Sequence, residues 1–148
     1  KDLNPYRFIV LENQALNTLG TALKNAAIAQ GETDEKTLTK AENMPLRAPM
    51  IIACVTDFKS HDKVPHWEQI AASSCAVQNL LLALMAQGFA TVWRTGPLAN
   101  APAIKQLFNV TADNQVIAFV YVGTAVSTIP PRSKIDVTPF IVYDNGTN

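Results

Sequence analysis

The longest stretch of this chain without Asp, Glu, Lys or Arg runs from Gln69 to Trp93, and most of it reads as one helix over residues 67–88. A membrane-spanning helix needs about 20 predominantly apolar residues. Here the unbroken apolar run covers only residues 80–86, and polar side chains interrupt the rest at Ser73, Ser74, Gln78, Asn79 and Gln87. We therefore expect no membrane span. A helix that is apolar nearly all round is a central one, buried in the domain or across a subunit interface.

Around this helix, strand-like and helix-like segments alternate along the chain. The predicted strands cover residues 6–12, 50–55, 89–92 and 114–124, with a later strand-like piece at Phe140–Tyr143. The predicted helices cover residues 13–31, 33–44, 67–88 and 99–110. The continuous apolar run at 50–55 is typical of a strand buried on both faces. This order predicts an α+β or α/β sandwich, in which helices flank a mixed central sheet.

The ends of the predicted helices carry residues suited to capping. Asn13 and Asn100 are candidate N-caps, and Thr33 or Asp34 takes this place in the polar helix. Gly31 is a candidate C-terminal stop. These residues set the boundaries that we expect for three of the four helices.

Length and composition suit a single globular domain over residues 1–148, with 48% hydrophobic and 16% charged residues. The formal net charge is zero, which argues against a nucleic-acid-binding protein because such proteins neutralise phosphates with a basic excess. The two cysteines, Cys54 and Cys75, form no CxxC pattern. We expect both to be buried free thiols in a reducing cytoplasm.

No constellation in the sequence is sufficient for catalysis by itself. His61 and His66 lie near Asp62 and Glu68, but a solvated loop before a helix explains these residues better than a metal site. Asp57 with His61 is a conceivable acid–base pair, yet nothing nearby marks a nucleophile. We therefore predict no catalytic side chain and no metal ligand. If the protein is an enzyme, a cofactor carries the reaction and the protein orients it.

The run Trp93-Arg94-Thr95-Gly96 follows the predicted strand at 89–92 and allows two interpretations. In the first, Trp93 covers the core, Arg94 is solvated, and Thr95 and Gly96 form a turn. In the second, the run binds a flat aromatic ligand that carries anionic or carbonyl groups. Trp93 then supplies a wall, Arg94 supplies donors in a fixed fork, and backbone amides of the turn meet ring heteroatoms.

Five stretches resemble the FMN-dependent nitroreductase family, in particular its small YdjA-like members, and the similarity as a whole covers the chain from Lys1 to about Tyr143. The most specific are "KVPHWEQ" and "AQGFATVWRTG", in the order and separation found in that family. The others are "KDLNPYRFIVLE", "AENMPLRAPMIIACV" and "VYVGT". The resemblance implies the nitroreductase-like three-layer sandwich. It also implies a homodimeric oxidoreductase that binds FMN at the dimer interface, takes electrons from NADH or NADPH, and reduces nitroaromatics, quinones or similar acceptors.

The resemblance also assigns residues to this function. Trp93, Arg94 and Thr95 match the triplet that contacts FMN, and Arg132, with Lys134 beside it, is a candidate contact for the FMN phosphate. A stretch assigned to nicotinamide cofactor binding matches Ala83, Leu84, Met85, Ala86, Gln87 and Gly88. No nucleophile is needed, because hydride passes directly between nicotinamide and flavin. The alternatives are a flavin-binding carrier or sensor without turnover, and a fold that binds no ligand.

Two departures from the family pattern affect these expectations. Members of the family begin before the position of Lys1, in a segment whose Arg-Arg-Ser motif binds the FMN phosphate. The aromatic residue after the proline, usually Trp in the family, is Tyr6 here. We expect a chain that starts at Lys1 to be truncated relative to the family and to bind FMN poorly, because a phosphate close to doubly charged needs paired donors.

Overall fold

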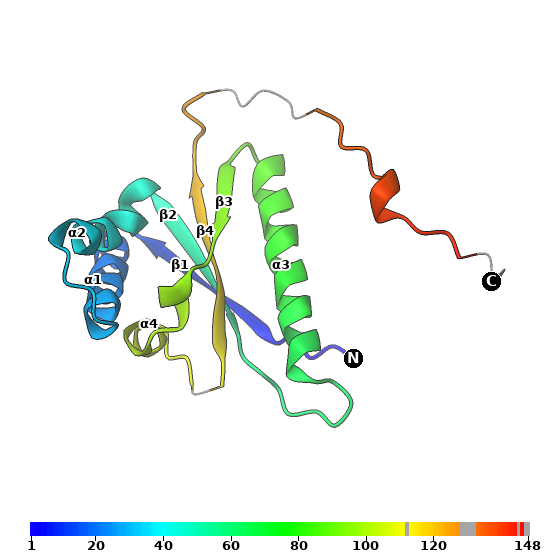
Figure 1. The fold of residues 1–148 in the computed structure, drawn as a ribbon, viewed down its shortest axis with the longest axis horizontal. Coiled ribbons are helices and arrows are strands. Elements are labelled where there is room, and N and C mark those ends of the chain that lie inside the picture. Colours follow the sequence, from blue (N-terminus) through cyan, green and yellow to red (C-terminus); the bar gives the residue numbers. More distant parts are fainter. Residues whose placement is uncertain (112, 128–132, 145, 147–148) are drawn as a thin grey trace.

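The computed structural model describes residues 1–111, 113–127, 133–144 and 146. Three layers build the described part of the chain (Figure 1). One layer holds the helices α1 (Gln14–Ala29), α2 (Glu35–Asn43) and α4 (Pro102–Leu107), and the opposite layer holds the helix α3 (His66–Ala86). The sheet between them consists of β1 (Tyr6–Glu12), β2 (Met50–Thr56), β3 (Ala90–Arg94) and β4 (Gln115–Gly123). The predicted α+β three-layer sandwich is confirmed.

The strand order of the sheet is β1-β2-β4-β3, and all three strand pairs are antiparallel. Among the described residues, the sheet is therefore antiparallel, whereas the sequence analysis expected a mixed sheet. The alternation of strands and helices suggested crossover connections, which would produce parallel neighbours. Instead, β1 and β2 run in opposite directions, as do β3 and β4. The connection through α3 gives β3 the same direction as β2, but β4 lies between these two strands, so they are not neighbours. The central strand β2 is buried from Ile51 to Thr56, as its continuous apolar sequence predicts.

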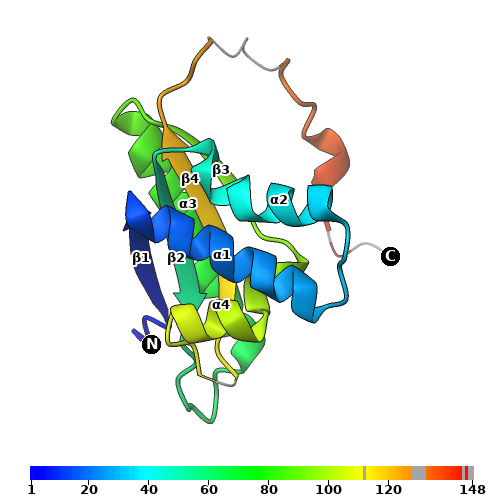
Figure 2. The same cartoon turned by 90° about the vertical axis from the view of Figure 1, so that its left-hand side faces the viewer.

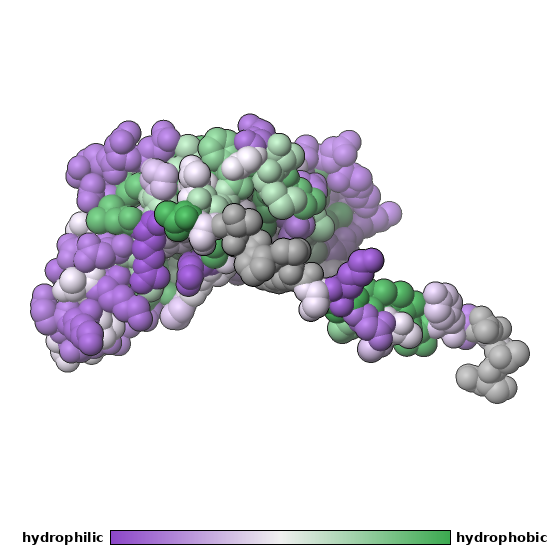
Figure 3. Space-filling model, turned by 90° about the horizontal axis from the view of Figure 1, so that it is seen from above, coloured by the Kyte–Doolittle hydropathy of each residue, from purple (hydrophilic) through white to green (hydrophobic). Residues whose placement is uncertain are grey.

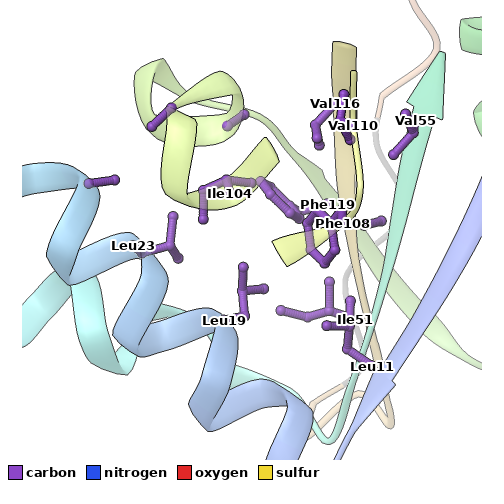
Figure 4. Close-up of a cluster of buried hydrophobic side chains, with 14 of the residues drawn as sticks. Leu11, Leu19, Leu23, Ile51, Val55, Ile104, Phe108, Val110, Val116 and Phe119 are labelled. Atoms are coloured by element: carbon purple, nitrogen blue, oxygen red, sulfur yellow. The ribbon is translucent and has the colours of Figure 1, made fainter. Parts of the chain in front are cut away.

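The larger core lies between the sheet and the α1 layer. Figures 2 and 4 show α1 and α4 against this face of the sheet, with Leu19 and Leu23 of α1 pointing toward Ile104 and Phe108. Leu19, Ile104 and Ile51 are almost completely buried there. The helical spacing of the leucines places them on one side of α1, so that this side faces the sheet.

In the described part of the chain, α3 is the one helix that covers the opposite face of the sheet. Only Gln69, Ser73 and Val77 of this helix are buried, four residues apart and therefore on one side of it. Val77 packs against Ile52 and Val120 of the sheet. By length and composition, α3 is apolar enough to cross a membrane, and 17% of its most apolar segment is buried within the chain. Of the two positions expected for α3, burial within its own domain is therefore wrong, and a position across a subunit interface stays a prediction.

Several predicted helix boundaries are confirmed, and Asn13 stands at the N-cap position of α1 as predicted, but the predicted cap at Asn100 is wrong. The Asp34 carboxylate accepts a hydrogen bond from the backbone N–H of Thr37 at 2.8 Å, which settles the choice between Thr33 and Asp34. Asn13 makes no side-chain cap hydrogen bond. Asn100 precedes α4 but caps nothing, because its amide instead bonds to the backbone of Val116, accepting at 2.8 Å and donating at 3.0 Å.

The cysteines and the C-terminal segment also differ from expectation. Cys54 is buried in β2, where burial and the nearby Asp57 carboxylate raise the pKa of its thiol to about 12. Cys75 is free but exposed on α3, so the prediction that it is buried is wrong. The strand-like piece Phe140–Tyr143 forms no strand. It begins instead in a short 3-10 helix (Thr138–Phe140), which Pro139 favours because it has no N–H to donate.

Candidate functional site

The candidate site is built on β3, a strand at the edge of the sheet. β3 pairs only with β4, so its other edge presents backbone donors and acceptors that no strand of the described sheet satisfies. Successive side chains of a strand point to opposite faces. Trp93 pairs with Val120, which belongs to the α3 face, whereas Arg94 pairs with Phe119, which belongs to the α1 face. The predicted triplet is thus divided between the two faces.

Trp93 and Thr95 are fixed by one backbone carbonyl. The Thr95 hydroxyl donates to the carbonyl oxygen of Ile117 at 2.8 Å, and the Trp93 indole N–H lies 3.2 Å from the Thr95 hydroxyl and 3.3 Å from the Ile117 carbonyl. This carbonyl is available because the β3–β4 pairing ends at Phe119 and the β2–β4 pairing is irregular beside Ile117. Trp93 remains 36% exposed. The result is a fixed aromatic surface at the end of β3.

Arg94 faces a pocket on the α1 side of the sheet. The pocket has a volume of about 300 Å³, and Arg94 shares its lining with Arg47 from the 3-10 turn before β2 and with Tyr121 from β4. Burial raises the pKa of the Tyr121 hydroxyl, and the positive charges of Arg47 and Arg94 partly oppose that rise. Of these three residues, the sequence predicts only Arg94 as a site residue. Arg47 and Tyr121 lie far from Arg94 in the sequence, and no local motif links them.

The second predicted group, residues 83–88, lies at the other end of β3. Ala83, Leu84, Met85 and Ala86 form the last turn of α3, Gln87 caps it, and Gly88 takes the positive φ of 87° that reverses the chain. Four residue steps of strand span about 13 Å, so this turn and the Trp93 region are well separated. The two predicted groups do not converge within one chain. Arg132, the predicted phosphate contact, lies outside the described residues.

The histidines near the start of α3 have structural partners. The ring of His66 stacks on Phe58, with centroids 4.0 Å apart, and the Nδ1 atom of His61 accepts a hydrogen bond from the backbone of Lys63. Asp57 is bound to Arg7 at 2.6 Å and therefore does not form the acid–base pair considered with His61. Among the described residues, no group of three or more His, Cys, Asp or Glu side chains is placed to hold a metal ion.

The pattern that leads from α3 into β3, and the three-layer fold around it, agree with the comparison with known proteins. Residues 1–124 match the Nitroreductase family. The chain belongs to the nitroreductase family. It is 35% identical over 144 residues to the Escherichia coli K12 protein named "Putative NAD(P)H nitroreductase YdjA", and the match covers 97% of this chain and 78% of that protein. This nitroreductase-family chain therefore has the nitroreductase-like fold that the sequence resemblance predicted.

Solved structures agree on the fold of this nitroreductase-family chain. A nitroreductase-like protein from Bacillus cereus superimposes with a TM-score of 0.81 at 17% identity, over 99% of this chain and 76% of that one. The structure described as FMN and NADPH-dependent nitroreductase NfnB from a Sphigopyxis strain gives a TM-score of 0.68 at 12% identity, over 97% of this chain and 81% of that one. At such identities, these two similarities show the fold alone.

Proposed function

We propose that this protein is an FMN-dependent NAD(P)H oxidoreductase that reduces nitroaromatics, quinones or similar small aromatic acceptors. The observation that carries the proposal is the family match over residues 1–124. The description of NfnB as FMN and NADPH-dependent supports the choice of cofactors, as does the name of the Escherichia coli relative. A soluble cytoplasmic homodimer, with FMN at the subunit interface, is part of the same proposal.

The end of β3 fits a flat heterocyclic cofactor. The first feature is the ring of Trp93, which offers a fixed aromatic surface. The Thr95–Ile117 hydrogen bonds hold this ring, while about one-third of the residue's surface stays accessible. The second feature is the unpaired backbone edge of β3, which offers hydrogen-bond donors and acceptors to the nitrogens and oxygens of the cofactor ring. We propose that Trp93, Arg94 and Thr95 contact FMN here, with Arg94 contributing its backbone because its side chain lies on the other face.

FMN, when bound, supplies the hydride transfer between NAD(P)H and the acceptor. The protein residues would orient the reactants and exclude water. We propose the turn at residues 83–88 as a nicotinamide-cofactor contact. It lies at the opposite end of β3 from Trp93, so the two groups serve one cofactor pair only if a second copy brings them together. Arg132 remains a proposed contact of the FMN phosphate.

The exposed side of α3 supports the homodimer. Leu82 and Met85 are 50% and 64% exposed, and neighbouring Phe89 is 45% exposed. Figure 3 shows hydrophobic surface gathered where the ends of α3 and β3 meet, with hydrophilic surface on both sides. A contiguous apolar surface of this kind marks an interaction site. We propose that a second copy covers it.

The proposed reaction is tested by following NADPH and NADH oxidation at 340 nm with purified protein, added FMN and a nitroaromatic acceptor. We expect oxidation that requires FMN and the acceptor together, because the proposed flavin carries the hydride from NAD(P)H to the acceptor. Bound flavin without acceptor-dependent oxidation would favour a carrier or sensor. Absence of flavin binding would contradict the proposal, provided that circular dichroism shows a folded protein.

Thr95→Val should weaken FMN binding by roughly three- to tenfold, because Trp93 and the Ile117 carbonyl lose their shared partner and the aromatic wall is no longer preorganised. The free energy of unfolding should fall by only about 1 kcal/mol, the net value of one hydrogen bond. Fluorescence titration with FMN measures the first effect, and urea unfolding measures the second. Thr18→Val in α1 is the matched control, because the Thr18 hydroxyl bonds only to a carbonyl of its own helix. Equal FMN affinity in the Thr95 variant and the parent would remove the triplet from the flavin site.

A further inference from the structure

The pocket on the α1 side of the sheet combines an apolar floor with two positive charges. Its floor consists of Leu19 and Leu23 of α1 together with Phe119 of β4, which are buried side chains of the main core. Arg47 and Arg94 line its exposed part. Its volume of about 300 Å³ lies at the lower end of the range for small-molecule sites. The pocket therefore has the size and the lining of a site for a small, partly apolar ligand.

The two guanidinium groups have no counterion in the described part of the chain. The side chains of Arg47 and Arg94 form no ion pair or hydrogen bond with any described residue, whereas Arg7 is bound to Asp57 and Lys24 to Glu42. Arg47, Arg94 and Tyr121 line the same pocket, and the charges of both arginines act on the Tyr121 hydroxyl. Two like charges beside one pocket repel each other, and an anion bound between them removes that repulsion.

We propose that this pocket binds a small carboxylate with an apolar, ring-sized body, at a site separate from the proposed flavin site. The guanidinium forks of Arg47 and Arg94 match the two oxygens of a carboxylate. The Tyr121 hydroxyl donates a further hydrogen bond, and the body of the ligand lies on Leu19, Leu23 and Phe119. The site is separate from the flavin site because Arg94 points to the face of β3 opposite Trp93.

Three probes distinguish what the pocket recognises. Benzoate carries the charge and the apolar ring, benzamide carries the ring without the charge, and inorganic phosphate carries charge without an apolar body. In titration calorimetry of the purified protein with its flavin present, we expect benzoate to bind with a Kd of about 1 mM or tighter. Benzamide and phosphate should each bind at least about tenfold more weakly than benzoate, because benzamide lacks the negative charge and phosphate lacks the apolar ring.

Arg47→Gln tests the charge outside the proposed flavin contacts. Its benzoate affinity should fall by about tenfold or more, and Arg47→Lys should be intermediate because it keeps the charge but loses the fork. Lys36→Gln is the control, since Lys36 is an exposed residue of α2 that does not line the pocket. Thermal unfolding of each variant checks that the fold is retained.

Several results would overturn the inference. One is the absence of benzoate binding by the parent protein, and another is an unchanged benzoate affinity in a folded Arg47→Gln variant. Benzamide or phosphate binding as tight as that of benzoate would overturn it as well. The flavin absorbance is recorded in the same samples. Displacement of FMN by benzoate would place benzoate in the flavin site and would also overturn the inference, whereas an unchanged flavin spectrum supports two separate sites.

Discussion

Gly20→Ala should destabilise the protein by about 3 kcal/mol, although alanine is the better helix former by about 1 kcal/mol. Gly20 lies on the side of α1 that contacts α2, and an added Cβ atom would stand 2.1 Å from the carbonyl oxygen of Glu42. That oxygen is backbone and cannot turn away. The two helices must therefore separate, which also disturbs the Lys24–Glu42 ion pair across the same contact.

Thermal unfolding measures the effect, and a loss of this size corresponds to a fall in Tm on the order of 10 °C for a domain of this length. Asn25→Ala is the control on the exposed side of α1, where a gain in helix propensity without a clash should leave the protein unchanged or slightly more stable. A Gly20→Ala variant as stable as the parent would show that α1 and α2 can separate without loss, contrary to the packing described here.

Leu82→Glu should convert the proposed homodimer into monomers. Leu82 is half exposed in the single chain, so glutamate is tolerated when α3 faces water. In a symmetric dimer, the substitution buries an unpaired carboxylate in each copy, at a cost of several kcal/mol for each. Multi-angle light scattering should give the mass of one chain, 16.1 kDa, in place of twice that value. Flavin content should fall with the dimer if FMN binds at the interface.

The matched control for this substitution is Ile28→Glu. Ile28 is an apolar residue of α1 with 49% exposure, on the layer opposite α3. It should leave the mass and the flavin content unchanged. A parent protein that is itself monomeric at micromolar concentration would contradict the proposed assembly, and so would a Leu82→Glu variant that remains dimeric.

The elements of this fold are predictable where local sequence and burial agree. The apolar run at 50–55 becomes the central strand, and the spaced leucines of α1 face the core, because each pattern has one structural solution. Local rules fail where a side chain serves a distant partner. Asn100 has the sequence position of a helix cap, but its amide bonds to Val116 of β4 instead.

For the candidate site, too, local patterns are predictable from the sequence and contacts with distant residues are not. The sequence predicts Trp93 and Thr95 as site residues, but it does not show that the Ile117 carbonyl fixes both side chains. It also treats Arg94 as part of one continuous triplet, although strand alternation places it on the other face. For α3, composition predicts an apolar helix correctly. Composition does not reveal that most of the apolar surface of α3 is exposed in the single chain. That exposure depends on whether a further layer covers the helix.

The pairing of Asn100 with Val116 has a consequence for solubility. β3 pairs with β4 only over residues 119–123, which leaves the earlier part of β4 without a strand neighbour on that side. An uncovered edge is a template on which another chain can add a strand and begin to aggregate. Here the Asn100 amide occupies both backbone groups of Val116, and Trp93 and Thr95 occupy the carbonyl of Ile117. Three side chains thus protect the short open edge of β4 against edge-to-edge association.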